Sequence, residues 1–143
     1  HPIYSTVLAS LADSRLPAID QNTATFFNRV VIDEDYGGLA LADEGARCAE
    51  MLSDNPCHVM IMGNHGILVI GDTVAQAFNR MYYFERAAET YIKALWTGQP
   101  LRRMSDEMAE SLAAALETYY GPTYGHFTEL VAVLDREEPD YRD

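Results

Sequence analysis

Two short apolar runs, residues 59–62 and 67–70, lie on either side of the polar turn Asn64-His65-Gly66. Short runs of strand-forming residues joined by a glycine-containing turn are typical of a β-hairpin. We therefore predict a hairpin over residues 58–70, with one imidazole at its tip. A rigid turn of this kind is a good place to present a ligand, although a histidine there is more often a surface residue.

Apolar positions recur at helical spacing in most of the remaining chain, and Val30 to Ile32 reads as a further strand. Helices alternate with strands in this pattern, which is typical of an α/β fold. The predicted helices span residues 2–13, 21–27, 43–52, 72–97 and 105–119, followed by a last helix that contains 127–134.

The helix over 43–52 should begin with Asp43 as its N-cap and should turn Ala46, Ala49, Met51 and Leu52 inward. In the longest helix, Thr73 and Gln76 have the spacing of a capping box, and Gly98 with Pro100 should end it.

Glu85 lies within the apolar stripe of this longest helix. A carboxylate in such a stripe must be paired or must face a cavity, because an unpaired buried charge is costly. Two interpretations stay open. Glu85 either forms a salt bridge with an arginine such as Arg80 or Arg86, or it orients a ligand histidine.

The chain has 143 residues, of which 48% are hydrophobic, so we expect one domain over 1–143. Its 22 acidic and 10 basic residues give a net charge of −12, which disfavours nucleic acid and anionic membranes as partners. Cys48 and Cys57 lack the spacing of a disulfide framework. No signal peptide or membrane-spanning run is apparent, so a cytoplasmic location is expected.

Four pieces of the chain occur together in a characteristic order: the opening His1-Pro2-Ile3-Tyr4, then Leu16-Pro17, the Asn64-His65-Gly66 turn, and Tyr83-Phe84-Glu85-Arg86-Ala87. In that order and spacing, residues 1 to about 100 resemble the class II aldolase/adducin head family. The resemblance implies a three-layer α/β/α domain with a mixed, largely antiparallel sheet, the N-terminal part of which is missing here. The residues from about 101 onward would form a C-terminal helical extension.

Enzymes of that family hold a divalent metal, usually zinc, with a His-x-His pair and the histidine of an Asn-His-Gly turn. By resemblance, His65 matches the turn ligand and His1 the second histidine of the pair. The other histidine and an upstream acidic residue have no counterpart in this chain. Asn64 and Gly66 would contact the substrate. The implied function is that of a homotetrameric, metal-dependent aldehyde lyase acting on a small hydroxy-carbonyl compound, sugar- or sugar-phosphate-like.

The chain also departs from the family. Fuculose-phosphate aldolases place a catalytic tyrosine shortly after the Leu/Ile-Pro element, but residues 18–22 contain none, and Asp20 is the candidate for a proton-transfer role there. His58 and His126 are expected to be structural or exposed. The alternative function is a non-catalytic, adducin-like binding or scaffold domain, although retention of His1 and His65 favours the enzyme.

Overall fold

The computed structural model of the chain describes residues 1–37, 42–53, 56–119 and 124–142. Its helices are α1 (Ile3–Ala9), α2 (Gln21–Ala24), α3 (Ala42–Met51), α4 (Val74–Trp96), α5 (Asp106–Tyr119) and α6 (Gly125–Glu137), with a 3₁₀ turn, η1, at Pro139–Arg142.

The sheet has three strands, β1 (Val30–Asp33), β2 (Val59–Met62) and β3 (Gly66–Val69), in the order β1-β2-β3. β1 runs parallel to β2, and β2 pairs with β3 as an antiparallel hairpin. The predicted hairpin and the mixed character of the sheet are therefore confirmed. Among the residues that the structure describes, one strand pairing is parallel and one is antiparallel.

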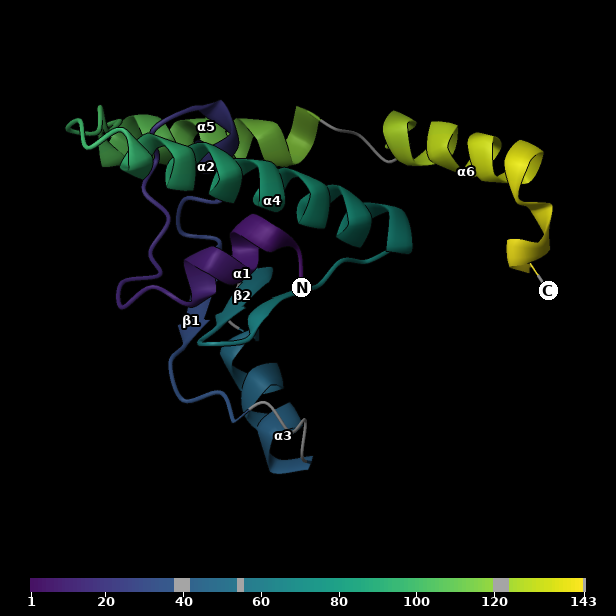
Figure 1. Ribbon diagram of the computed structural model, residues 1–143, viewed down its shortest axis with the longest axis horizontal. Coiled ribbons are helices and arrows are strands. Elements are labelled where there is room, and N and C mark those ends of the chain that lie inside the picture. Colours follow the sequence, from purple (N-terminus) through teal and green to yellow (C-terminus); the bar gives the residue numbers. More distant parts are fainter. Residues whose placement is uncertain (38–41, 54–55, 120–123, 143) are drawn as a thin grey trace.

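The two faces of the sheet carry different layers because successive side chains of a strand point in opposite directions. On one face Val59 and Ile61 pack with Leu8 of α1 and Phe84 of α4. On the other face Met60 and Met62 pack with Cys48 of α3. Figure 1 shows α1 and α4 on one side of the strands and α3 on the other, which is the expected three-layer α/β/α arrangement.

Local signals fix the ends of the longest helix. Thr73 is the N-cap of α4, where its hydroxyl accepts from the amide of Gln76 at 3.1 Å. Gly98 follows the helix with φ of 66°, a left-handed conformation that suits glycine. The Gln76 side chain accepts from the amide of Asp72 rather than from that of Thr73, so the predicted capping box is only half formed.

The predictions for α1 and α3, the helices on the two faces of the sheet, were partly wrong. α1 ends at Ala9 instead of residue 13, and α3 begins at Ala42, so Asp43 lies inside the helix. Ala46 and Ala49 are exposed, whereas Cys48 is buried. α3 is oriented by Cys48 in the apolar layer and by an ion pair between Arg47 and the buried Asp33 of β1.

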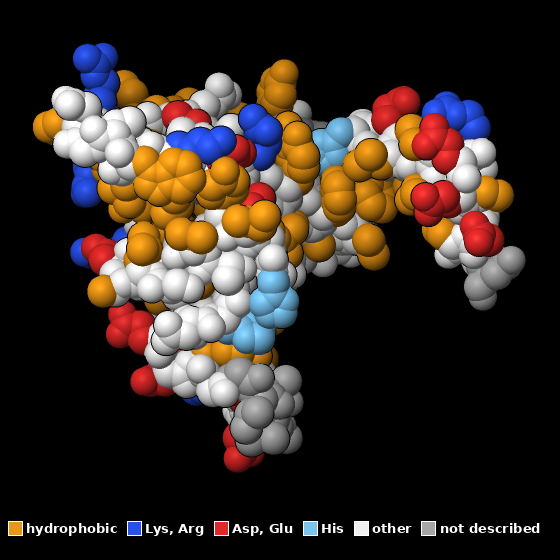
Figure 2. Space-filling view, viewed as in Figure 1, with side chains coloured by type: hydrophobic (Ala, Val, Ile, Leu, Met, Phe, Trp, Pro, Cys, Tyr) orange, Lys and Arg blue, Asp and Glu red, His pale blue; other side chains and the backbone are white. Residues whose placement is uncertain are grey.

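The C-terminal helices differ in how firmly they are packed. α5 lies on α2 through a small cluster of Ala18, Ala24 and Ala109. α6 has no buried residue and extends away from the rest of the chain (Figure 1). Apolar side chains are gathered over α6 and the adjoining end of α4 in Figure 2. Across the described residues, no helix is both long and apolar enough to cross a membrane.

Candidate metal-binding site

The structure brings His1 and His65 together, although 64 positions separate them. Their Nε2 atoms lie 3.1 Å apart, and the ring centroids are separated by 4.6 Å at an interplanar angle of 65°. His1 is exposed and His65 is half-buried, so the paired nitrogens are accessible from solvent. Two nitrogens at this distance can share a proton as a hydrogen bond, or they can both face one cation.

His1 is held in place through the helix that follows it. Pro2 is the N-cap of α1 but contributes no side-chain hydrogen bond. Glu85 of α4 caps the helix instead. Its carboxylate accepts from the backbone amides of Tyr4 and Ser5, both at 2.8 Å, and from the Ser5 hydroxyl at 2.6 Å. A carboxylate at a helix N-terminus satisfies amides that have no partner within the helix and is also favoured by the helix dipole.

The environment of Glu85 was therefore only partly predicted. It forms no ion pair with Arg80 or Arg86, and it bonds to the backbone after His1 rather than to an imidazole. Glu85 instead ties Tyr4 and Ser5, in the first turn of the helix that follows His1, to the longest helix.

The hairpin turn places His65. Asn64 adopts φ of 56°, and its amide donates to the carbonyl of Ala9 at 2.9 Å, which ties the turn to the end of α1. Gly66 has φ of 154°, and a Cβ built there would lie 3.5 Å from Cδ2 of His1. That distance is an ordinary contact, so the position calls for glycine because of its positive φ rather than for lack of space. This geometry does not test the predicted substrate contacts of Asn64 and Gly66, which stay predictions.

Tyr36 also lies at the site, although no sequence pattern indicated it. Its ring centroid lies 4.8 Å from that of His65, with the planes tilted by 56°. A tyrosine in an acidic loop has no distinguishing pattern, so only the fold reveals this contact. It limits the orientations open to the His65 ring.

The other candidate residues have structural environments. The Asp20 carboxylate caps α2 and accepts from the amide and hydroxyl of Thr23 at 2.8 and 2.7 Å. His58 is buried, and His126 packs against Phe78 at a centroid distance of 5.4 Å. Among the residues the structure describes, no three or more His, Cys, Asp or Glu side chains are grouped to hold a metal ion. The His1–His65 pair would thus supply two ligands.

Comparison with known proteins identifies the family. Residues 1–92 match the Class II Aldolase and Adducin N-terminal domain, so the chain belongs to this family. Its sequence is 31% identical over 78 residues to the decarboxylase NovR of Streptomyces niveus, a match that covers 54% of this chain and 28% of that protein.

Solved structures agree with this assignment. An aldolase II superfamily protein from Pseudomonas syringae matches all of this chain and 57% of its own, with a TM-score of 0.84 and 27% identity. An L-fuculose 1-phosphate aldolase from Glaciozyma antarctica PI12 shares the fold, with a TM-score of 0.74 and 20% identity over 94% of this chain and 50% of that one. The chain therefore spans only about half the length of these solved relatives.

Proposed function

We propose that the protein is a metal-dependent, aldolase-like lyase in which His1 and His65 are two ligands of a divalent cation. The single observation that carries this proposal is the 3.1 Å separation of the two Nε2 atoms. It supports the ligand assignment because side chains far apart in sequence present equivalent nitrogens to one point.

The donor set fits zinc. Ligands at the usual Zn–N distance of about 2.0–2.1 Å in a tetrahedral site have nitrogens about 3.3 Å apart. The observed separation of 3.1 Å is within a few tenths of an ångström of that value, so little movement of either ring would be needed. Neutral imidazoles suit zinc and several other divalent metals, so the proposal is for Zn²⁺ or a similar ion.

A divalent cation at this place would polarise a substrate carbonyl and stabilise the negative charge that develops when an adjacent carbon–carbon bond breaks or forms. The chain's own residues provide the ligands and hold them. Glu85 fixes the start of α1 behind His1, and Tyr36 packs beside His65. We assign no proton transfer to Asp20, because its carboxylate is occupied as the cap of α2.

We infer a small hydroxy-carbonyl substrate, sugar- or sugar-phosphate-like. The names of the relatives support this class: one is an aldolase for a sugar phosphate and another is a decarboxylase. Aldol cleavage and decarboxylation both break a carbon–carbon bond and leave electrons that a neighbouring carbonyl can accept. One metal-bound carbonyl site could serve either reaction.

The experiment is an assay of the complete protein against hydroxy-carbonyl compounds, including sugar phosphates, and against 3-keto acids, before and after chelation. We expect cleavage that chelation removes and that zinc or another divalent ion restores. His65→Ala should abolish it, whereas His126→Gln should not. A folded protein that shows no turnover and the same metal content with His65→Ala would favour the adducin-like scaffold instead.

We further propose a homo-oligomer, with a tetramer as the expected form. The support is the exposed apolar surface of α6, where the side chains of Leu130 and Leu134 are 47% and 38% exposed, together with Tyr82 of α4 at 45%. Light scattering of the complete protein should give a multiple of the chain mass. A monomer at micromolar concentration would count against the proposal.

A further inference from the structure

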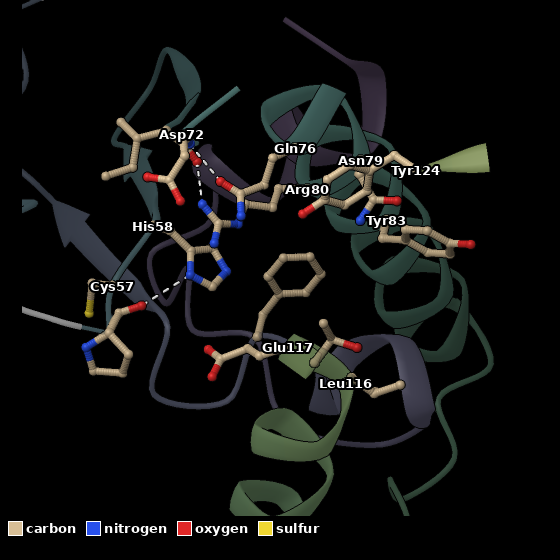
Figure 3. Close-up of a pocket in the computed structure, with 14 residues that line it drawn as sticks. Cys57, His58, Asp72, Gln76, Asn79, Arg80, Tyr83, Leu116, Glu117 and Tyr124 are labelled. Atoms are coloured by element: carbon tan, nitrogen blue, oxygen red, sulfur yellow. Dashed lines mark hydrogen bonds between the residues drawn. The ribbon is translucent and has the colours of Figure 1, made fainter. Parts of the chain in front are cut away.

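A second polar site lies at the opposite end of the hairpin from His65. It is a cavity of about 400 Å³ at the place where the amide of Ile70 donates to the carbonyl of His58. The first turns of α4 and the end of α5 form its other walls (Figure 3). Four residue steps along β2, a rise of roughly 13 Å, separate His58 from the strand end nearest the turn.

Two of the lining side chains are buried and polar. His58 and Asn79 are each only 7% exposed. The Nδ1 atom of His58 lies 3.0 Å from the carbonyl of Pro56, so Nδ1–H is the donor and Nε2 is left as an acceptor. Burial lowers the pKa of His58 to about 4, which keeps the imidazole neutral and this acceptor available near neutral pH.

Neither Nε2 of His58 nor the carboxamide of Asn79 has a hydrogen-bond partner among the residues described. Neither group is among the fully buried, unpartnered polar atoms of the described residues, so both reach the open cavity and can be hydrated or can bind a ligand there. A few polar groups that converge on one cavity are typical of a small-molecule site.

Arg80 supplies a positive charge to the same cavity. One guanidinium N–H donates to the carbonyl of Ile70 at 2.8 Å, and no carboxylate of the described residues lies within ion-pair distance. Burial lowers the pKa of Arg80, but a guanidinium remains charged in proteins. Figure 3 shows this group beside the His58 ring.

The acidic residues of the cavity do not neutralise Arg80 directly. Glu117 is bonded to Arg29 at 3.0 Å, and Asp72 is exposed at the rim. The cavity therefore presents three polar groups: the Arg80 guanidinium, which has further N–H donors, the neutral acceptor Nε2 of His58, and the Asn79 carboxamide, which can donate and accept.

We propose that this cavity binds a small oxyanion that also carries an O–H group, such as a hydroxycarboxylate or hydrogen phosphate. The anionic oxygens accept from Arg80, the O–H donates to Nε2 of His58, and the Asn79 carboxamide completes the contacts. A volume of about 400 Å³ is within the usual range for small-molecule sites. The inference does not depend on the metal site, because none of these side chains contacts His1 or His65.

The test is isothermal titration of the complete protein at constant ionic strength with glycolate, inorganic phosphate and acetate. We expect glycolate or phosphate to bind at one site per chain, and the tighter of the two identifies the class. Acetate has no hydroxyl and should bind at least tenfold more weakly. The His65→Ala variant should retain binding, which separates this site from the metal site.

Arg80→Gln should weaken binding at least tenfold, while Arg86→Gln, an exposed position on the same helix, should leave it unchanged. Asn79→Ser provides a second variant if Arg80→Gln does not fold, and it should also weaken binding. The proposal is overturned if neither probe binds to the folded protein, if acetate matches both probes, or if folded Arg80→Gln or Asn79→Ser binds as the wild type does.

Discussion

Replacement of Glu85 by glutamine isolates the contact that positions His1. The two carboxylate oxygens accept three hydrogen bonds, from the amides of Tyr4 and Ser5 and from the Ser5 hydroxyl. Glutamine has nearly the same shape, but only one of its terminal atoms can accept. If the glutamine oxygen accepts from the Tyr4 amide, the glutamine NH₂ group faces the Ser5 amide. Two N–H donors then oppose each other, and no hydrogen bond forms between them.

The expected magnitude follows from these contacts. The substitution removes one charge-assisted bond to a backbone amide, worth about 1.5–3 kcal/mol, and weakens the bond that remains. Solvent can partly rescue the freed amide because Glu85 is only half-buried. We therefore expect the free energy of unfolding to fall by about 2 kcal/mol, a value typical of a lost helix cap.

The same change should reduce zinc affinity, because the start of α1 carries His1. Loss of a residue that orients a ligand typically costs 10- to 100-fold in metal affinity. The assays are urea unfolding and competitive zinc titration of the complete protein. Glu89→Gln is the matched control: Glu89 lies one turn further along α4, pairs with Lys93 at 2.5 Å and touches neither histidine, so both quantities should stay near wild type. Wild-type stability and zinc affinity in Glu85→Gln would show that Glu85 does not hold the start of α1 and His1 in place.

Three further changes test other parts of the fold. Arg29 is 3% exposed and pairs with Glu110 and Glu117, so Arg29→Met should lower the free energy of unfolding in urea by about 1 kcal/mol, because the two carboxylates lose a partner but are 45% and 36% exposed and can be hydrated. The pKa of His58 is lowered from 6.5 to about 4 in the folded protein, so the unfolded chain takes up a proton first as the pH falls below 6.5, and the free energy of unfolding decreases toward pH 4. In urea titrations, His58→Asn should therefore lose about 2 kcal/mol less stability than the wild type between pH 6.5 and 5. Gly66→Ala should cost about 1–3 kcal/mol at φ of 154°, whereas Gly45→Ala, with open space around it, should not destabilise; thermal unfolding of both variants decides.

Local patterns were sufficient to predict the elements with strong signals. The hairpin follows from two apolar runs and a polar turn, and the start and end of α4 follow from Thr73 and Gly98. α3 was less well placed because its alternative faces are both rich in small residues. Only contact with the sheet distinguishes buried Cys48 from exposed Ala46 and Ala49.

The convergence of His1 and His65 was expected from resemblance to a family, since no periodicity relates residues 64 positions apart. Their supports could not be predicted from the pattern. Glu85 was recognised as unusual within an apolar stripe, but its partners are backbone amides, which have no sequence signature. Arg80 and Asn79 likewise read as ordinary polar helix positions until the strands and α5 enclose them.

The most direct test of the His1–His65 metal site is the zinc affinity of the complete protein, compared with that of the His1→Ala and His65→Ala variants. The two Nε2 atoms face one point, so we expect one zinc ion per chain and at least a 100-fold loss in either variant. The double variant should lose little more than each single variant, because both remove the same site. His126→Gln serves as the control. Zinc binding that is unchanged in folded His65→Ala protein would contradict the assignment of this pair as metal ligands.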